Sequence, residues 1–225
     1  MKCCRNFVPM LMAFIIGFIL PDVSMGGIMG NYDLKVFPSS PTGYETIYGK
    51  KANYYLDYDV SINGSKNMEA FCVEGADASK LTQQYTFLSI DKSLKDFGLN
   101  PAIYGTAAWI AEKYYNQSED WKAAAQVAIW EVVFDDLTRN LDVGNLIADT
   151  YKQEAQSILD TLPTTLPDFS NNWVLAVNPT VGSDGTVGQK EYQNYLVRVP
   201  EPATMLLLGF RLLGIVFFRR QRIFK

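Results

Sequence analysis

Residues 54–60 read YYLDYDV, in which apolar and polar side chains alternate with a period of two. The apolar face carries Tyr54, Leu56, Tyr58 and Val60. This alternation is typical of a strand with one buried face. Residues 123–130 read AAAQVAIW, which is apolar nearly all round at helical spacing and indicates a buried helix. One core therefore has to combine a sheet with at least one enclosed helix.

The rest of the chain extends this pattern in both directions. Segments rich in tyrosine, valine and isoleucine are separated by turn-forming Ser-Pro-Thr-Gly, Asn-Gly-Ser and Gly-Ala-Asp. The predicted strands are 28–37, 44–48, 51–62, 69–74, 84–90, 173–178 and 191–199, with a hairpin turn at 182–185. The predicted helices are 102–116, 118–136 with Ser118 as its cap, and 146–162 before Pro163. This order predicts an α+β fold: an antiparallel β sheet or barrel with an inserted bundle of about three helices.

The N-terminal residues have the composition of a secretory signal. Lys2 and Arg5 form a basic region, residues 7–20 are apolar, and small residues follow from Ser24. The apolar run is shorter than the roughly 20 residues of a membrane span. We therefore predict a signal peptide at 1–26; an uncleaved N-terminal anchor is the alternative. An ectodomain at 27–198 and a C-terminal tail at 199–225 complete the predicted organisation.

Charge and composition exclude several classes of protein. The chain has 20 basic and 24 acidic residues, of which seven basic and two acidic ones lie in 1–26 and 201–225. The part between them carries 13 basic and 22 acidic residues, a net charge of −9, which argues against a nucleic-acid partner. Histidine is absent, so the commonest general base and the usual catalytic zinc ligands are missing. We expect a protein that is not an enzyme and uses neither a metal nor a cofactor; a hydrolase is the weakest alternative.

The C-terminal tail has three parts in a fixed order. Pro200, Glu201 and Pro202 precede an apolar stretch at 203–218, and an arginine-rich cluster follows. As a helix the 16 apolar residues would span about 24 Å, short of a hydrocarbon core of about 30 Å. The basic cluster predicts that the C-terminus stays in the cytoplasm.

This tail resembles the PEP-CTERM sorting signal of Gram-negative bacteria. The resemblance implies cleavage near Pro-Glu-Pro by an exosortase-type enzyme. It also implies a precursor tethered in the inner membrane through 203–218, and then sorting to the cell surface or an extracellular matrix. Arg211 departs from the pattern, because an arginine at mid-span costs roughly 2.5–3.5 kcal/mol. An ordinary single-pass anchor without processing is the alternative.

A second pair of motifs lies in the ectodomain. Cys72 is the one cysteine outside the signal region, in the strand-like segment Phe-Cys-Val-Glu. Gln126 interrupts the apolar helix pattern, and a buried amide without partners costs about 1–3 kcal/mol. A lone cysteine in an exported protein cannot form an internal disulfide.

These two segments resemble the thioester domains of bacterial surface adhesins. The resemblance implies that the sulfur of Cys72 attacks the side-chain carbonyl of Gln126, releases ammonia and forms an internal thioester. An amine on another molecule can then open it and leave a covalent tether. The neighbours that the resemblance assigns to packing around the bond are Phe71, Val73, Ala128, Ile129 and Trp130. Exopolysaccharide or amine-bearing surface proteins are the implied partners.

A simpler interpretation remains open at each of these positions. Gln126 can serve only to bond backbone at a helix–sheet junction, and Cys72 can be an inert core residue of a non-covalent structural or exopolysaccharide-binding matrix protein. The carboxylates of Glu131, Asp135 and Asp136 are predicted to form a solvated helix end, and Asp184 a turn. Sugar stacking and strand-face packing are both possible for the tyrosines, and packing is predicted, at Tyr32, Tyr44, Tyr48, Tyr54, Tyr55 and Tyr58.

Overall fold

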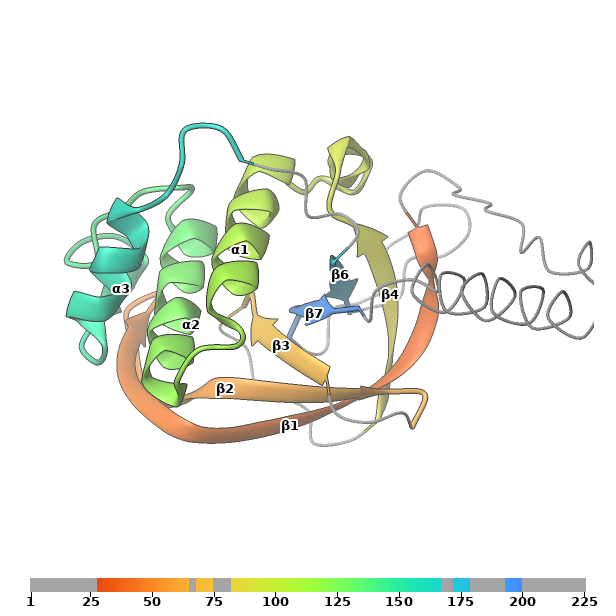
Figure 1. The fold of residues 1–225 in the computed structure, drawn as a ribbon, viewed down its shortest axis with the longest axis horizontal. Helices are drawn as coiled ribbons and strands as arrows, with labels where there is room; N and C mark the ends of the chain where they lie inside the picture. Colours follow the sequence, from red (N-terminus) through yellow and green to blue (C-terminus); the bar gives the residue numbers. More distant parts are fainter. Residues whose placement is uncertain (1–27, 65–67, 75–81, 167–171, 179–192, 200–225) are drawn as a thin grey trace, which may run out of the picture.

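A computed structural model of the chain describes residues 28–64, 68–74, 82–166, 172–178 and 193–199 (Figure 1). The predicted signal peptide, the turn at 182–185 with Asp184, and the sorting tail lie outside these residues. That tail includes Pro200, Glu201, Pro202 and the stretch 203–218.

The described residues form one antiparallel sheet of seven strands in the order β2-β3-β7-β6-β4-β1-β5. The strands are β1 (Ile28–Ile47), β2 (Lys50–Ile62), β3 (Met68–Cys72), β4 (Gln83–Ser89), β5 (Leu146–Ala148), β6 (Trp173–Val177) and β7 (Tyr195–Arg198). The long β1 curves around the domain and pairs with β4 through its first part and with β2 through its second (Figure 1). The antiparallel sheet and the α+β class are confirmed.

Strand β1 corrects one predicted turn. Ser-Pro-Thr-Gly at 40–43 was expected to separate two strands, but it lies inside one strand that pairs with β2 on both sides of it. The pairing shifts register between Ser39 and Thr42. Proline has no N–H for the ladder, and a bulge is the place where a strand tolerates it. The turn into β2 instead lies at Tyr48 and Gly49, both with positive φ, as a two-residue hairpin requires.

Three α-helices lie side by side, with α2 between the other two (Figure 1). They are α1 (Pro101–Tyr114), α2 (Glu119–Phe134) and α3 (Lys152–Asp160), and a short 3-10 helix, η2 (Lys92–Phe97), precedes them. Asn100 caps α1 by accepting from the Ala102 N–H at 3.0 Å. Ser118 occupies the cap position of α2, but its side chain makes no capping hydrogen bond there.

The third predicted helix is wrong over its first third, residues 146–151. Residues 146–148 pair with the end of β1 as strand β5, and the helix begins only at Lys152. The backbone N–H groups of Asp149 and Thr150 bond to the Glu45 carboxylate, which holds this segment on the sheet. A long-range contact therefore decides a segment whose local pattern is typical of a helix.

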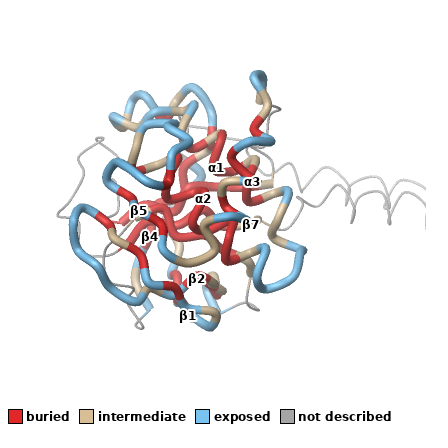
Figure 2. Tube along the Cα trace, turned by 90° about the vertical axis from the view of Figure 1, so that its left-hand side faces the viewer, coloured by how far each residue is buried: buried red, intermediate tan, exposed pale blue. Residues whose placement is uncertain are grey.

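The core lies between the sheet and α2 (Figure 2). Leu56, Tyr58 and Val60 are buried and Tyr54 is half-buried, which confirms the predicted inner face of β2. All side chains from 123 to 132 in α2 are buried, as its nearly unbroken apolar pattern indicates. Gln126 and Glu131 are the two polar side chains within this buried stretch.

Candidate functional site

Cys72 and Gln126, 54 residues apart in sequence, are in direct contact. The Cys72 backbone N–H donates to Gln126 Oε1 at 2.9 Å, and Gln126 Nε2 donates to the Cys72 carbonyl oxygen at 2.7 Å. Both residues have an exposed fraction of 0%. The amide plane of Gln126 therefore lies against the last residue of β3, with both of its polar atoms used.

The end of strand pairing explains this contact. The Val73 N–H bonds to Asn194 next to β7, so the N–H and C=O of the preceding Cys72 point to the other side of the strand. On that side lies β2, but its pairing with β3 ends at Tyr58 and Ala70. The side chain of Gln126 fills the position that the next residue pair of β2 would have occupied. Buried backbone groups need such partners, and α2 supplies one.

The sulfur of Cys72 is buried and is protonated at neutral pH. Sγ donates to the Glu74 carbonyl oxygen at 2.7 Å and accepts from the Glu74 N–H at 3.4 Å. Burial raises the pKa of the thiol to about 12, and hydrogen bonds from the Glu74 backbone and from the side chains of Trp130 and Gln193 oppose this rise. At neutral pH the group is a thiol, which is a weak nucleophile until a reaction partner takes its proton.

The residues named for packing are all in the core beside this contact. Phe71, Val73, Ala128, Ile129 and Trp130 are buried. The Phe71 ring lies 5.8 Å from that of Trp173, and Trp130 packs between Tyr54 and Phe134. The pair is therefore enclosed by large side chains, an environment from which water is excluded.

Sequence reasoning missed the polar residues of the 193–195 segment. Tyr195 OH donates to Gln193 Oε1 at 2.8 Å, and Gln193 Nε2 donates to the Glu74 carbonyl oxygen at 3.4 Å. The Glu74 carboxylate accepts from Asn194 N and Nδ2 at 3.2 and 2.8 Å. The partners lie about 120 residues apart in sequence, so no local pattern signals that these polar groups are buried together.

Two of the three carboxylates at the end of α2 differ from the prediction, and the third, Asp136, is exposed as predicted. Glu131 is buried rather than solvated, and its Oε1 accepts from Thr138 Oγ1 at 2.6 Å and Asn140 N at 2.9 Å. Burial raises the pKa of Glu131. Asp135 accepts backbone N–H groups from Asn145 and Leu146, so both carboxylates hold the loop into β5. The described residues contain no cluster that could bind a metal.

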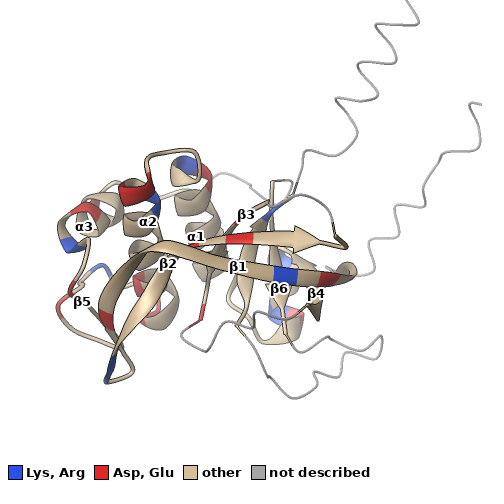
Figure 3. Ribbon diagram, turned by 90° about the horizontal axis from the view of Figure 1, so that it is seen from below, with Lys and Arg blue, Asp and Glu red and all other residues tan. Residues whose placement is uncertain are grey.

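Some of the tyrosines pack against the core and others are exposed. Tyr58 is buried, and Tyr32 and Tyr54 pack partly against the core, as predicted. Packing was the wrong prediction for Tyr44 and Tyr55, which are exposed. Tyr48 is also largely exposed, but its ring lies 5.4 Å from that of Phe134. Lysine and arginine positions are dispersed over the described ribbon rather than gathered in the stripe that a nucleic acid needs (Figure 3).

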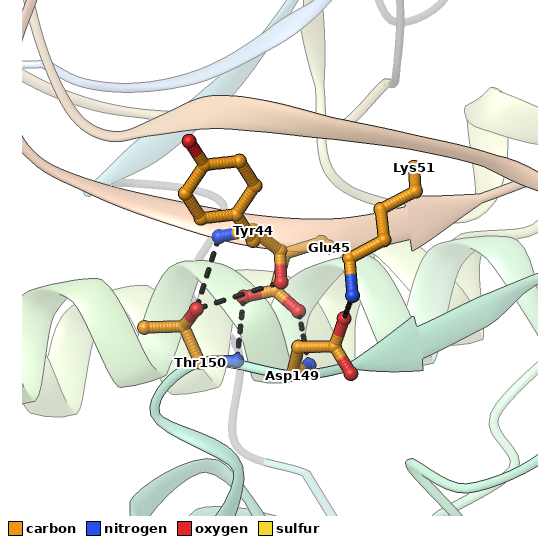
Figure 4. A network of polar contacts seen from close by, with 5 residues as sticks. All are labelled: Tyr44, Glu45, Lys51, Asp149 and Thr150. Carbon is orange, nitrogen blue, oxygen red and sulfur yellow. Dashed lines mark hydrogen bonds and ion pairs between the residues drawn. The ribbon is translucent and has the colours of Figure 1, made fainter.

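A second buried polar cluster joins β1 to the segment after β5 (Figure 4). Glu45 is fully buried, and its Oε2 and Oε1 accept from Asp149 N at 2.8 Å and Thr150 N at 3.2 Å. Thr150 Oγ1 accepts from Tyr44 N at 3.0 Å, and Lys51 pairs with the Asp149 carboxylate. Burial raises the pKa of Glu45 to about 7 despite these hydrogen bonds.

Comparison with known proteins gives a family model that matches the tail and solved structures that are similar to the chain. Among solved structures, the N-terminal domain of the Streptococcus pyogenes pilus tip adhesin Cpa is similar to this chain at 18% identity and a TM-score of 0.41. The alignment covers 74% of this chain and 98% of that one, and nothing about function is carried over at this level of likeness. No curated protein matches the chain. No helix within the described ranges is long and apolar enough to cross a membrane.

The tail match is specific. The family model of the PEP-CTERM protein-sorting motif matches residues 198–222. The predicted boundary at 199 and the Pro-Glu-Pro at 200–202 both fall at the start of this match. The chain carries a PEP-CTERM sorting motif, which marks an exported protein that is processed at the membrane and sorted to the cell surface.

Proposed function

We propose that the ectodomain is a covalent surface tether, in which Cys72 and Gln126 form an internal thioester that a primary amine on another molecule opens. The observation that carries this proposal is the contact between the two residues. The Gln126 amide is bonded to both backbone polar groups of Cys72, and both residues are fully buried. Two groups held together in this way have an effective concentration far above that of free reactants.

The reaction balances without a cofactor. Cys72 Sγ bonds to Gln126 Cδ, the Cδ–Nε2 bond breaks, and the leaving nitrogen takes the thiol proton and departs as ammonia. The Cys72 N–H already donates to Gln126 Oε1, where negative charge develops in the tetrahedral intermediate. Later a primary amine attacks Cδ, an amide forms, and the sulfur returns to a thiol. Burial would protect the thioester from water between these steps.

One observation favours a second function, that of a non-covalent structural or exopolysaccharide-binding matrix protein. The same two hydrogen bonds that prepare Gln126 for attack also give it a complete structural role at the end of β3. The pKa of about 12 also disfavours a free thiolate. Under this alternative Cys72 is an inert core residue and Gln126 a substitute strand partner.

Intact mass separates the two functions. Loss of ammonia lowers the mass of the purified ectodomain by about 17 Da, and an amine then adds its full mass as the thiol is released. We expect the loss in the natural protein and not in Cys72→Ala or Gln126→Ala. A natural protein at its calculated mass, with a thiol that titrates freely after denaturation, would leave only the non-covalent function.

For the tail, we infer cleavage near residues 200–202 by an exosortase-type enzyme after a stage tethered through 203–218. Replacement of Pro200, Glu201 and Pro202 by alanine is expected to keep the full-length chain in the inner membrane. Cell fractionation with mass analysis of the C-terminus measures this. Equal release of both chains into the medium would argue against such processing.

A further inference from the structure

We propose that the indole N–H of Trp130 and the side-chain amide of Gln193 form, with the Glu74 backbone N–H, a donor site for the sulfur of Cys72. The site stabilises negative charge on sulfur both when the thioester forms and when an amine opens it. This inference rests on the proposed function for its role, although the donor site itself can be tested on the free thiol.

Trp130 has the position and the unused donor that such a site needs. It lies four residues after Gln126, on the same face of α2, and its exposed fraction is 0%. Its Nε1–H makes no hydrogen bond of regular geometry within the described part of the chain. The Tyr54 ring at 5.7 Å and the Phe134 ring at 6.4 Å fix the plane of the indole. A buried indole donor normally finds a partner, and a hydrogen bond from the Trp130 side chain opposes the rise in the pKa of the Cys72 thiol.

Gln193 lies in the segment that leads into β7, the strand paired with β3, and its side chain acts on the Cys72 thiol from there. Its side chain is 2% exposed, and the hydroxyl of Tyr195 donates to its Oε1 at 2.8 Å, which fixes the orientation of the amide. Tyr85 OH holds the Gln193 carbonyl oxygen at 3.0 Å. The amide nitrogen then points to the Glu74 carbonyl oxygen, the same atom that accepts the thiol proton of Cys72.

The three donors act on the Cys72 sulfur, which is a weak hydrogen-bond acceptor as a thiol and a strong one as a thiolate. Burial disfavours the thiolate. The hydrogen bonds of the Glu74 backbone and of the Trp130 and Gln193 side chains act against that effect, whereas the negative charge of the Glu74 carboxylate adds to it. During formation, sulfur gives its proton to the leaving nitrogen as it bonds to Gln126 Cδ. During opening, the electron pair of the S–C bond returns to sulfur, which takes its proton from the attacking amine. Donors to sulfur therefore lower the barrier in both directions.

The test compares three variants that each remove one interior side-chain donor. Trp130→Phe and Gln193→Met remove proposed sulfur donors. Trp173→Phe is the control, because Trp173 is equally buried but its Nε1 donates to Glu112 Oε2 at 2.7 Å. We expect about a tenfold slower opening by methylamine for each of the first two, which corresponds to about 1.4 kcal/mol, and no comparable slowing in the control.

The direction of the change separates a donor from a packing residue. Removing a residue that only packs loosens the site, so methylamine would open the thioester faster and an alkylating reagent would react faster with the free thiol that opening releases. Removing a donor slows both reactions, and the slowing of alkylation persists across pH because the thiolate fraction falls. Tyr195→Phe, which releases the Gln193 amide, should show a smaller slowing in the same direction.

One result would overturn the donor site, and another would refute only the thioester. Unchanged or faster alkylation in both Trp130→Phe and Gln193→Met would contradict it. A natural protein without the mass loss would refute the thioester alone, since alkylation of the free thiol still reports on the donors. If Trp130→Phe fails to fold, Gln193→Met and benzothienylalanine at position 130, which keeps the ring system without the N–H, give the same comparison.

Discussion

Gln126 and Glu45 solve the same structural problem with different chemistry. Each is a fully buried polar side chain that bonds backbone groups where strand pairing runs out, Gln126 at the end of β3 and Glu45 beyond the end of β5. Gln126 both donates and accepts, and it is neutral. Glu45 accepts two N–H bonds, but burial raises the pKa of its carboxyl to about 7. An amide can therefore hold a buried strand end at every pH, whereas a carboxylate does so at a cost that changes with pH.

The largest effect is expected when the neutral amide of Gln126 is replaced by a carboxyl group like that of Glu45. In Gln126→Glu an ionised side chain can no longer donate to the Cys72 carbonyl oxygen and becomes a buried charge without a cationic partner. We expect a loss of about 3–5 kcal/mol in the free energy of unfolding at pH 8. The loss should shrink at pH 5, because the protonated carboxyl regains a donor. Urea unfolding at both pH values measures this. An equal loss at pH 5 and pH 8 would contradict the role of the Gln126 side chain as a donor to the Cys72 carbonyl oxygen.

The second effect is the pH dependence that Glu45 brings. Its carboxyl has a raised pKa in the folded state, from 4.5 to about 7, so the folded protein holds the proton more tightly than the unfolded chain. Stability should therefore fall as pH rises from 4.5 to 7 and stay low above that. Glu45 contributes about 2–3 kcal/mol to this fall in the free energy of unfolding, after allowance for solvent screening.

The variant Glu45→Gln isolates the contribution of Glu45 to the pH dependence of stability. We expect its stability to change less between pH 5 and pH 8 than that of the natural protein, by the amount given above. A residual slope in the same direction remains in both, because burial also raises the pKa of Asp59, Glu69 and Glu131. Glu119→Gln, at an exposed carboxylate in the first turn of α2, is the control that should keep the natural slope. Equal slopes in Glu45→Gln and the natural protein would refute the assignment to Glu45.

The third effect tests how closely the chain packs around Glu45. A Cβ added at Gly43 would lie 2.7 Å from Leu56 Cδ1 and 2.9 Å from Glu45 Oε1. Gly43→Ala must therefore displace a core leucine or the carboxylate, and we expect it to cost about 1–3 kcal/mol. Thermal unfolding measures this. A change within a few tenths of a kcal/mol would show that the hairpin moves freely over this cluster.

The same two sites mark what the sequence could predict. The alternation at 54–60 and the all-round apolar pattern of α2 predicted the buried face of β2 and the burial of Gln126, because both patterns report burial through nearby residues. The role of Glu45 had no such signal, since its partners lie 104 and 105 residues later. Those partners also delay the start of the third helix, which begins at Lys152 rather than at 146. Local periodicity therefore indicated the burial of Gln126, which interrupts an apolar helix, but it indicated neither the burial of Glu45 nor the strand β5 beside it.

The smallest effect concerns the outer end of the Glu45 cluster. Thr150→Val keeps the shape of the side chain but removes the oxygen that accepts the Tyr44 N–H at 3.0 Å. We expect a loss of about 1 kcal/mol, the usual net value of one hydrogen bond, by urea unfolding at pH 8. Thr46→Val is the matched control, a half-exposed threonine on the same strand that should change little. Because the Thr150 hydroxyl also lowers the pKa of Glu45, its removal should steepen the pH dependence that Glu45→Gln reduces. A loss at Thr150 with no such steepening would mean that the hydroxyl holds Tyr44 alone and that the carboxylate is set by the two backbone N–H groups.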